Sequence, residues 1–532
     1  MNISANRLQH FLFPTDGPTY ARATQVFVRL LGLVFLIAFV SFWSQLGGLW
    51  ASDGILPIAD RLELFEGHML AEQMGGHPFW KMPSLFWFIG TSDAALHGLC
   101  AAGVLASILL IVGVFPAGVL VALWLLYLSL QTAGGAFMGF QWDILLLETG
   151  FAAIFIAPWR LYARPGSDWE PSRVGRWLMW FLLFKLMFLS GAVKLSSGDE
   201  TWRGLTALNY HFFTQPLPTW TSYHAHQLPE AILRFGVGVM VFIELVLPFF
   251  IFMRGQFRRV AALGFIALQL GIMATGNYGF FNILSLLLAV LLIDDALLDG
   301  VLGRMEEKKK AVKKKAISSV RVVSHTVMAG AAGLLIMLSG LHLGAAVAQG
   351  TDYPGGLART LDFTRTLRIN NRYGLFASMT TTRPEILIEG SLDGERWELY
   401  EFKYKPGSLR ERPKFVAPHQ PRLDWQMWFA ALGNCEQNLW LLDFQKHLLE
   451  ANPAVLKLLA KDPFDGEAPR FVRSTIYLYE FTGYDERRQS GHWWSRDEGE
   501  PYCPVLSIVD ELRRSDRCCS FARRDGRKTP AT

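Results

Sequence analysis

Long apolar stretches recur through the first two thirds of the chain, and each is long enough to cross a lipid bilayer as a helix. A spanning helix needs about 20 mostly apolar residues. Only 18% of the 532 residues are charged, against about 25% in ordinary soluble domains. So many apolar segments exceed what one soluble core can bury, which excludes a cytosolic multidomain enzyme. The predicted spans lie roughly at 24–47, 95–114, 116–133, 142–158, 176–197, 230–253, 259–276, 278–298 and 323–348.

The weakest of these nine spans is 142–158, because it is short and contains Glu148, with Asp143 at its edge. Its Leu, Ile and Phe residues favour insertion by about 4 kcal/mol, whereas one central carboxylate opposes insertion by about 3 kcal/mol. Insertion is therefore marginally favoured.

The distribution of basic residues indicates which side of the membrane each loop faces, since cytoplasmic loops are enriched in Lys and Arg. With a cytoplasmic N-terminus, nine spans place every strongly basic loop on the cytoplasmic side. The basic residues counted are Arg7, Arg22, Arg160, Arg164, Arg173, Arg176, Arg254, Arg258, Arg259 and the lysines at 308–310 and 313–315. The lysines could bind anionic lipid or nucleic acid, but they are primarily interpreted as a topology determinant. The net charge of +5 is too small to indicate a nucleic-acid partner.

The expected architecture is a polytopic α-helical membrane bundle followed by an extracytoplasmic β-rich α+β domain. The bundle comprises residues 1–350 and the C-terminal domain residues 351–532. The protein is therefore expected in a membrane, with its N-terminus in the cytoplasm.

Four ionisable residues lie inside predicted spans: Glu148, Lys185, Lys194 and Glu244. Each costs about 3 kcal/mol in a bilayer centre unless it is paired. Lys185 and Lys194 are nine residues apart, which puts them on opposite faces of one helix. The structural interpretation pairs Lys185 with Glu148 or Glu244 and places Lys194 near the outer interface. The functional interpretation makes a lysine a proton-transfer base.

The segment 190–229 is rich in Trp, Tyr, His and Pro and too polar to span, so it is expected to cap the bundle. His211, His224 and His226 could hold zinc, but no Cys or carboxylate stands at ligand spacing beside them. We expect no metal and no cofactor.

Beyond residue 350 the pattern becomes that of a soluble domain. Residues 385–407 alternate apolar and polar positions on both sides of Asp393 and Gly394, which predicts a hairpin. The run 470–484 is rich in β-branched and aromatic residues and should pair with it. Between them, 422–434 and 438–464 have helical periodicity. Five cysteines without a CxxC pair indicate no disulfide framework.

One segment of this domain concentrates Arg422, Asp424, Trp425 and Trp428. The two tryptophans share a helix face, which fits either a core-anchoring helix with an Arg–Asp pair or a partner-binding patch. The chain contains no G-x-S-x-G, P-loop or GxGxxG motif.

Several long runs resemble the lipase maturation factor family. They are NNRYGLFASMTTTRPEILIEGSLDGERWELYEFKYKPG, RPKFVAPHQPRLDWQMWFAALGN, KLSSGDETWRGLTALNYHFFTQPLPT and the late GHWWSR. In animals this family consists of polytopic membrane proteins of the endoplasmic reticulum that help homodimeric lipases fold and assemble. The resemblance implies a secreted, lipase-like client that meets the lumenal C-terminal domain. Its signature or client-binding residues would be Asn371, Tyr373, Gly374, Phe376, Arg422, Asp424, Trp425 and Trp428.

No N-x-S/T sequon occurs in any segment placed outside the cytoplasm, although lumenal domains often carry one. Together with the apparently unpaired cysteines, this favours a bacterial member in the cytoplasmic membrane.

Two hypotheses follow. The first is a maturation factor that binds and assembles clients without chemistry of its own. The second is a membrane enzyme, because Gly191 and Lys194 form a G-x-x-K element that resembles the bundle of the vitamin K-dependent carboxylases. In that case Lys194, or Lys185, would act as a base. The sequence does not fix the oligomeric state.

Overall fold

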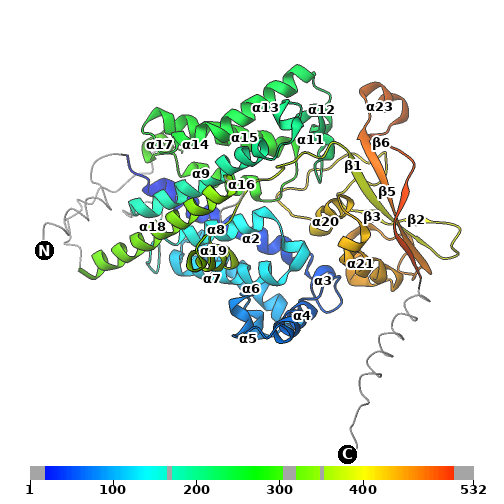
Figure 1. Cartoon of the computed structure of the whole chain (residues 1–532), viewed down its shortest axis with the longest axis horizontal. Helices are drawn as coiled ribbons and strands as arrows, with labels where there is room; N and C mark the ends of the chain where they lie inside the picture. Colours follow the sequence, from blue (N-terminus) through cyan, green and yellow to red (C-terminus); the bar gives the residue numbers. More distant parts are fainter. Residues whose placement is uncertain (1–17, 165–170, 303–318, 348–352, 508–532) are drawn as a thin grey trace, which may run out of the picture.

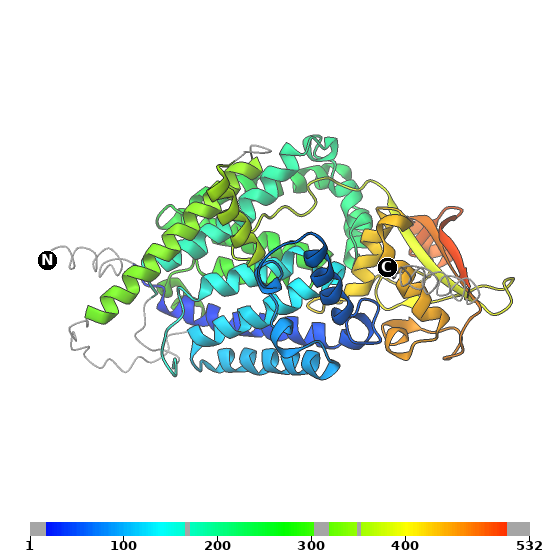
Figure 2. The ribbon, with the colours of Figure 1, turned by 60° about the horizontal axis from the view of Figure 1, so that its bottom comes forward.

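The computed structural model of the protein describes residues 18–164, 171–302, 319–347 and 353–507. A bundle of long helices forms the larger part, and a small antiparallel sheet lies at one end of it (Figures 1 and 2). Helices α20 (Arg422–Ala431) and α21 (Leu439–Leu449) lie between the sheet and the bundle (Figure 1). The predicted combination of a helical membrane bundle with a β-rich C-terminal part is confirmed.

Seven segments among the described residues are long and apolar enough to cross a membrane. All seven coincide with predicted spans. They are α2 (Ala21–Trp43), α6 (Asp93–Val112), α7 (Pro116–Ala133), α9 (Arg173–Ser196), α13 (Glu230–Leu245) continued by α14 (Leu247–Phe250), α15 (Gln256–Thr275) and α18 (Ser319–Val347).

The other two predicted spans are shorter than expected. The fourth is α8 (Gln141–Ala153), with 13 residues, and the eighth is α16 (Phe281–Val290), with 10 residues. The predicted bounds of these two spans are therefore too long, and neither helix is among the seven candidate spans of the described residues. Both helices are largely buried by neighbouring helices, and irregular backbone is tolerated at membrane depth when protein surrounds it.

The chain nevertheless passes from one end of the bundle to the other at α8 and at α16. We call the end where α2 begins the proximal end and the end where α2 stops the distal end. After α8, the carbonyl of Leu161 accepts a hydrogen bond from the backbone N–H of Phe115, at the proximal turn between α6 and α7. After α16, the carboxylate of Asp295 accepts hydrogen bonds from the backbone N–H groups of Arg22 and Ala23 at the start of α2. Both short helices thus connect the two ends, as the predicted topology requires.

Short helices cover much of the distal end. The segment 190–229, which is expected to cap the bundle, begins inside α9 and folds into three of them only after Ser196. From this part Trp202 donates its indole N–H to the carbonyl of Phe376 at 3.0 Å. The three helices of this segment are α10 (Glu200–Arg203), α11 (Leu208–Thr214) and α12 (Trp220–His226). The remaining short helices of the bundle and its linker are α3 (Leu46–Leu49), α4 (Ile58–Ala71), η1 (Pro78–Trp80), α5 (Phe86–Ile89), η2 (Gly135–Met138), α17 (Asp295–Leu302) and α19 (Gly355–Thr366).

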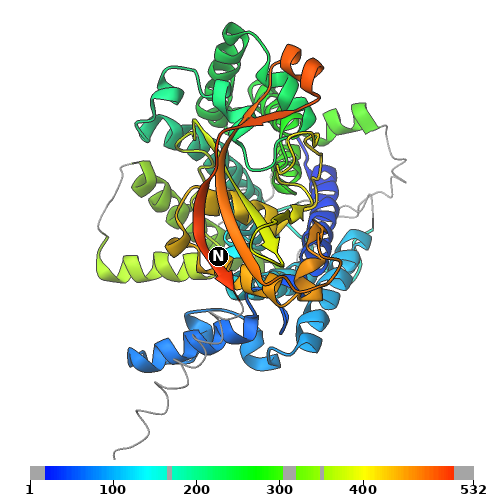
Figure 3. The ribbon, with the colours of Figure 1, turned by 90° about the vertical axis from the view of Figure 1, so that its right-hand side faces the viewer.

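The C-terminal sheet is antiparallel, with the order β2-β1-β5-β6 and with β7 also paired to β5. Figure 3 shows its long strands crossing the end of the bundle. The strands are β1 (Arg383–Ser391), β2 (Glu398–Leu399), β5 (Phe471–Phe481), β6 (Trp494–Arg496) and β7 (Glu500–Ser507). The predicted hairpin forms between β1 and β2, and Gly394 in its turn has φ +83°, a left-handed conformation that favours glycine. The predicted pairing of the second run is confirmed by the β1–β5 ladder.

The two predicted helical runs of this domain are mostly helical. Besides α20 and α21 they contain η3 (Cys435–Gln437) and α22 (Pro453–Leu456), and α23 (Tyr484–Ser490) follows β5. The end of the second run differs from the prediction. It forms β4 (Leu459–Lys461), which pairs with β3 (Glu401–Phe402), because the sheet partner overrides a helical apolar spacing.

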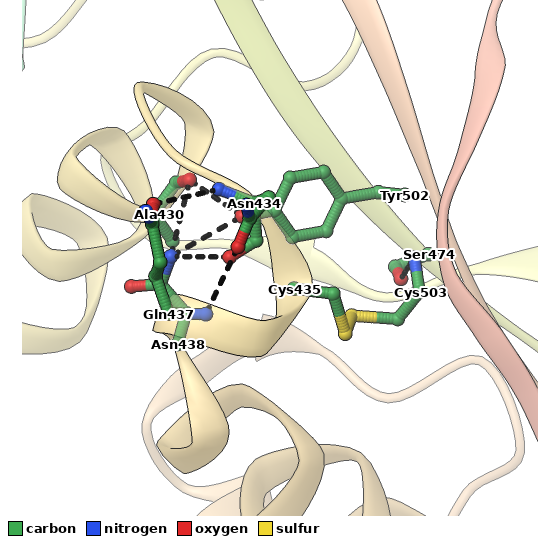
Figure 4. The surroundings of a disulfide bond; sticks show 8 residues. All are labelled: Ala430, Asn434, Cys435, Gln437, Asn438, Ser474, Tyr502 and Cys503. Atoms are coloured by element: carbon green, nitrogen blue, oxygen red, sulfur yellow. Dashed lines mark hydrogen bonds between the residues drawn. A yellow bond between two sulfur atoms is a disulfide. The ribbon is translucent and has the colours of Figure 1, made fainter.

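A disulfide joins Cys435 to Cys503, 68 residues later, so the expectation that the cysteines lack a framework is wrong for this pair (Figure 4). Beside it, the hydroxyl of Tyr502 donates to the carbonyl of Ala430 at 2.6 Å. These links fasten the end of α20 to β7. The pairing also removes the cysteine argument for a bacterial origin.

Candidate functional site

Two buried ion pairs stand on opposite faces of α9, as the nine-residue spacing predicts. Lys185 is fully buried and pairs with Glu148 of α8. Lys194 donates to both carboxylate oxygens of Glu244 on α13, each at 2.8 Å. Each lysine therefore has its own carboxylate, which offsets the cost of burying the charge.

The pair at Lys185 is sealed by a segment from the C-terminal side of the chain. Glu148 Oε2 accepts three hydrogen bonds from this segment: from the backbone N–H of Asn371 at 2.9 Å, from its side-chain amide at 2.9 Å and from the hydroxyl of Tyr373 at 2.7 Å. The side-chain oxygen of Asn370 accepts from Lys185 at 3.3 Å and from Ser339 of α18 at 2.9 Å. Residues 370–373 thus insert into the bundle and connect three helices.

Arg422 makes a second connection at the start of α20. Its guanidinium donates two parallel hydrogen bonds to the carboxylate of Asp143, at 2.9 and 2.8 Å, and both side chains are fully buried. The hydroxyl of Tyr127 donates to the same carboxylate at 2.5 Å. A bidentate Arg–carboxylate pair is among the strongest charged contacts in proteins. Helix α20 is therefore fastened to the distal end of the bundle.

The Arg–Asp pair expected within the 422–428 segment does not form. Asp424 instead accepts hydrogen bonds from the backbone N–H groups of Tyr404 at 2.8 Å and Lys405 at 3.0 Å. Burial raises the pKa of Asp424 above its usual value, although these N–H groups oppose the rise. Sequence spacing alone suggested Asp424 because it is two residues away, whereas Asp143 is 279 residues away.

Trp425 and Trp428 belong to the interior of this junction, with exposed fractions of 3% and 7%. The ring of Trp425 meets that of Trp142 edge-on, with centroids 4.6 Å apart. Trp428 donates its indole N–H to the carbonyl of Thr214 at 2.8 Å. A client could touch these rings only if the junction opened, so their predicted role in client contact stays a prediction.

Gly374 and Phe376 lie where the inserted segment leaves the bundle. A Cβ on Gly374 would come within 2.6 Å of Val193, so the close approach to α9 requires glycine. The ring of Phe376 meets the imidazole of His211 edge-on, with centroids 4.9 Å apart.

A third buried charge cluster was not anticipated from the sequence. Glu385 on β1 pairs with Arg383 at 2.5 Å and with Lys405 at 3.1 Å, and all three are buried. Arg383 also donates to the carbonyl of Pro216 at 3.0 Å. The sequence does carry a signal for this cluster. Arg383 and Glu385 are two residues apart on one strand, so their side chains point to the same face of the sheet.

The surroundings of Lys194 differ from those of Lys185, because a cavity of about 460 Å3 borders the Lys194–Glu244 pair. His211 also lines it, and its imidazole contacts the hydroxyl of Tyr278 at 3.1 Å. Burial, aided by the charge of Lys194, lowers the pKa of His211 to about 4, so this imidazole is neutral at neutral pH. The three histidines of segment 190–229 do not converge: His224 contacts Tyr484 instead, and the described part of the chain holds no cluster of three metal-ligating side chains.

Comparison with known proteins covers both parts of this arrangement. The family model of the lipase maturation factor transmembrane domain matches residues 22–300, and that of the lipase maturation factor C-terminal domain matches residues 369–504. The second match thus begins at the segment that inserts beside Glu148. No solved structure matches the chain.

Curated relatives align over almost the whole chain. Lipase maturation factor 2 of Gallus gallus is 33% identical over 93% of this chain and 82% of its own length. Lipase maturation factor 1 of Bos taurus is 34% identical over 91% of this chain and 89% of its own length. Lipase maturation factor 2 of Homo sapiens is 33% identical over 91% of this chain and 83% of its own length. With both domain models matched in order and relatives spanning the helices and the sheet alike, this chain belongs to the lipase maturation factor family.

Proposed function

We propose that this integral membrane protein is a maturation factor that helps a secreted lipase, or another exported client, to fold or assemble. The observation that carries the proposal is the alignment with proteins named lipase maturation factor over more than nine tenths of the chain. Catalysis is no part of the proposal.

We further propose that the client meets the distal end, where the sheet and α20–α23 lie. The buried pairs Lys185–Glu148 and Arg422–Asp143 hold this end on the bundle, so the signature residues Asn371, Tyr373 and Arg422 serve the client by fixing the surface that it meets. The outer surface of this end carries exposed apolar side chains, among them Leu439 and Leu478. Such side chains can contact an incompletely folded client.

The proposed orientation places the C-terminal residues 351–532 outside the cytoplasm and the N-terminus inside. The Cys435–Cys503 disulfide supports it, because disulfides persist in the endoplasmic reticulum and the periplasm and are rare in the cytosol. The charge pattern of the loops supports the same orientation. In a eukaryotic source the membrane would be that of the endoplasmic reticulum, and in a bacterial source the cytoplasmic membrane.

The carboxylase-like alternative gains no support. The matched domain models and the relatives reported above carry the maturation factor name. The ammonium of Lys194 donates to both carboxylate oxygens of Glu244. This ion pair gives Lys194 a structural role that requires no catalysis.

The test compares secreted lipases from cells that contain or lack this protein. We expect the loss of the protein to lower lipase activity per mass of secreted lipase, while lipase synthesis stays unchanged. Leu439→Asp and Leu478→Asp, on the exposed surface, should reproduce part of that loss at normal protein abundance. Leu263→Asn on α15 provides a matched control, because Leu263 is also exposed but lies on a spanning helix.

Unchanged specific activity of every exported lipase in cells without the protein would overturn the proposal. The orientation is tested separately with a membrane-impermeant thiol reagent. In a protein whose Cys518 and Cys519 are replaced by Ser, Ser490→Cys on α23 should react with reagent added on the extracytoplasmic side of sealed membranes. Gly255→Cys, between α14 and α15, should not react under the same conditions.

A further inference from the structure

The cavity beside Lys194 has the size and wall of a small-molecule site. It lies among α9, α11, α13, α15 and α16, and its volume of about 460 Å3 falls within the usual range for such sites. Apolar side chains form most of its wall, including Leu186, Met187, Ile243, Leu268 and Ile272. An apolar chain would therefore fit along it.

The cavity reaches the outer surface of the bundle between α13 and α15. Two residues of its lining on α13, Phe235 and Val239, are 73% and 39% exposed, and Gly271 on α15 is also exposed. Both helices lie at an edge of the bundle (Figure 1) and are among those long and apolar enough to span a membrane. The mouth therefore faces lipid, and a ligand can enter from the bilayer.

Helix geometry places the ion pair near one surface of the membrane. Lys194 stands 18 residues after Arg176 on α9, which corresponds to about 27 Å at 1.5 Å per residue. The hydrocarbon core is about 30 Å thick. The Lys194–Glu244 end of the cavity thus lies close to the distal boundary, and the apolar wall extends toward the membrane interior.

Two amide side chains on the cavity wall keep free hydrogen-bonding groups. Asn282 donates to Gln269 at 2.7 Å, and the two residues are 2% and 5% exposed. Within the described part of the chain, the amide NH2 of Gln269 and the carbonyl oxygen of Asn282 have no hydrogen-bond partner. Exchanging the two amide orientations still leaves one donor and one acceptor. A polar group without a partner in an apolar setting is unfavourable, so a ligand that satisfies both groups is favoured.

The wall carries no net charge. The charges of Lys194 and Glu244 cancel within their ion pair, and His211 is neutral at neutral pH because burial lowers its pKa to about 4. A ligand with a net charge would lack a counter-charge here, whereas an uncharged ligand incurs no such penalty.

We propose that this cavity binds an uncharged membrane lipid that carries a carbonyl and a hydroxyl near its polar end, of the diacylglycerol type. The acyl chain lies along the apolar wall, the carbonyl accepts from Gln269 and the hydroxyl donates to Asn282. The lipid enters between α13 and α15. This inference goes beyond the proposed function, because it concerns a lipid and needs no client.

The experiment uses the full-length protein in nanodiscs of phosphatidylcholine that contain a photoreactive diacylglycerol. After illumination, mass spectrometry identifies the labelled peptides. We expect labels on α13 and α15, and we expect unlabelled diacylglycerol to compete better than triacylglycerol, which has ester carbonyls but no hydroxyl. This competition needs no variant, so it tests the proposal even if a substituted protein fails to fold.

Three variants locate the site and test its preference for diacylglycerol. A Cβ on Gly271 would meet open space, so Gly271→Leu fills the mouth without displacing neighbours and should reduce labelling by about tenfold, the equivalent of 1.4 kcal/mol. Gly238→Leu is the matched control, because Gly238 also has open space, lies on α13 and does not line the cavity. Gln269→Leu combined with Asn282→Leu should remove the preference for diacylglycerol over triacylglycerol.

Equal labelling of the Gly271→Leu and Gly238→Leu proteins would overturn the proposal. So would equal labelling of the wild-type cavity by a photoreactive phosphatidylcholine, which would indicate unselective contact with bilayer lipid. Lipid occupancy is measured on the purified protein, without a client. The lipid proposal can therefore fail while the maturation proposal holds, and the maturation proposal can fail while the lipid proposal holds.

Discussion

The two lysines of α9 show how differently one helix can use the same residue type. Lys185 and Lys194 are both buried and each pairs with a glutamate from another helix. Lys185, however, is enclosed by the inserted segment 370–373, whereas Lys194 borders a cavity whose lining reaches the outer surface of the bundle at Phe235 and Val239. The charge pair alone therefore does not reveal a role. The surroundings of an ion pair determine its role: a pair enclosed by another segment joins two parts of the chain, and a pair beside a cavity lines a site.

Breaking the Arg422–Asp143 pair should have the largest effect and tests the joining role most directly. Arg422→Met leaves a fully buried carboxylate with Tyr127 as its remaining partner, which should cost about 3–5 kcal/mol of unfolding free energy. Thermal unfolding in detergent measures the loss.

A second substitution separates the charge effect from packing. Adding Asp143→Leu to Arg422→Met removes the unpaired charge, so the double variant should be more stable than the Arg422→Met protein. If the loss of unfolding free energy in the double variant equals the sum of the losses in the Arg422→Met and Asp143→Leu proteins, the pair does not hold the junction together.

Lys185→Met should have the next largest effect, about 3 kcal/mol. Glu148 would lose its counter-charge but keep three donors from Asn371 and Tyr373. Because these donors come from the C-terminal side, limited proteolysis should cut the connection around α19 faster in this variant. Glu148→Gln in the same protein should restore resistance, since a neutral amide oxygen still accepts from Tyr373.

Lys194→Met should cost less than Lys185→Met, about 1–2 kcal/mol. Glu244 borders the cavity at the end where its few polar side chains gather, and water that enters there can solvate an unpaired carboxylate. The measurement is the difference in melting temperature between the two methionine variants. A larger loss at Lys194 than at Lys185 would contradict the contrast between a sealed pair and an open one.

Much of the architecture is predictable from local pattern. The seven long spans, the Asp393–Gly394 hairpin and the pairing of β1 with β5 follow from apolar length, turn chemistry and alternation, all of which act over short distances. Helices α8 and α16 were predicted, but not where they end, because an apolar run does not show where surrounding protein lets the backbone leave the helix.

The site residues were found, but their partners were harder to predict. Opposite faces of α9 follow from helix periodicity, and Glu148 was one of two possible partners for Lys185. The partnership of Arg422 with Asp143 and the Cys435–Cys503 bond join residues far apart in the chain. One sequence carries no signal for such pairs, since any of several acidic residues or cysteines would satisfy the same chemistry.

Acidification should weaken the junction by a smaller amount than any of these substitutions. The imidazole of His419 contacts the hydroxyl of Ser41 on α2 at 2.9 Å, and burial, together with the nearby charges of Arg422 and Lys403, lowers its pKa from 6.5 to about 4. The folded state therefore disfavours protonation, so stability is fully present above pH 6.5 and declines as the pH falls toward 4. Because His419 is partly exposed, we expect a loss of about 1 kcal/mol at pH 5. His419→Gln should flatten the decline, measured as melting temperature against pH. Since the pKa values of His211 and His226 are lowered too, part of the decline should persist in this variant, and a curve identical to that of the wild-type protein would exclude His419 as a contributor.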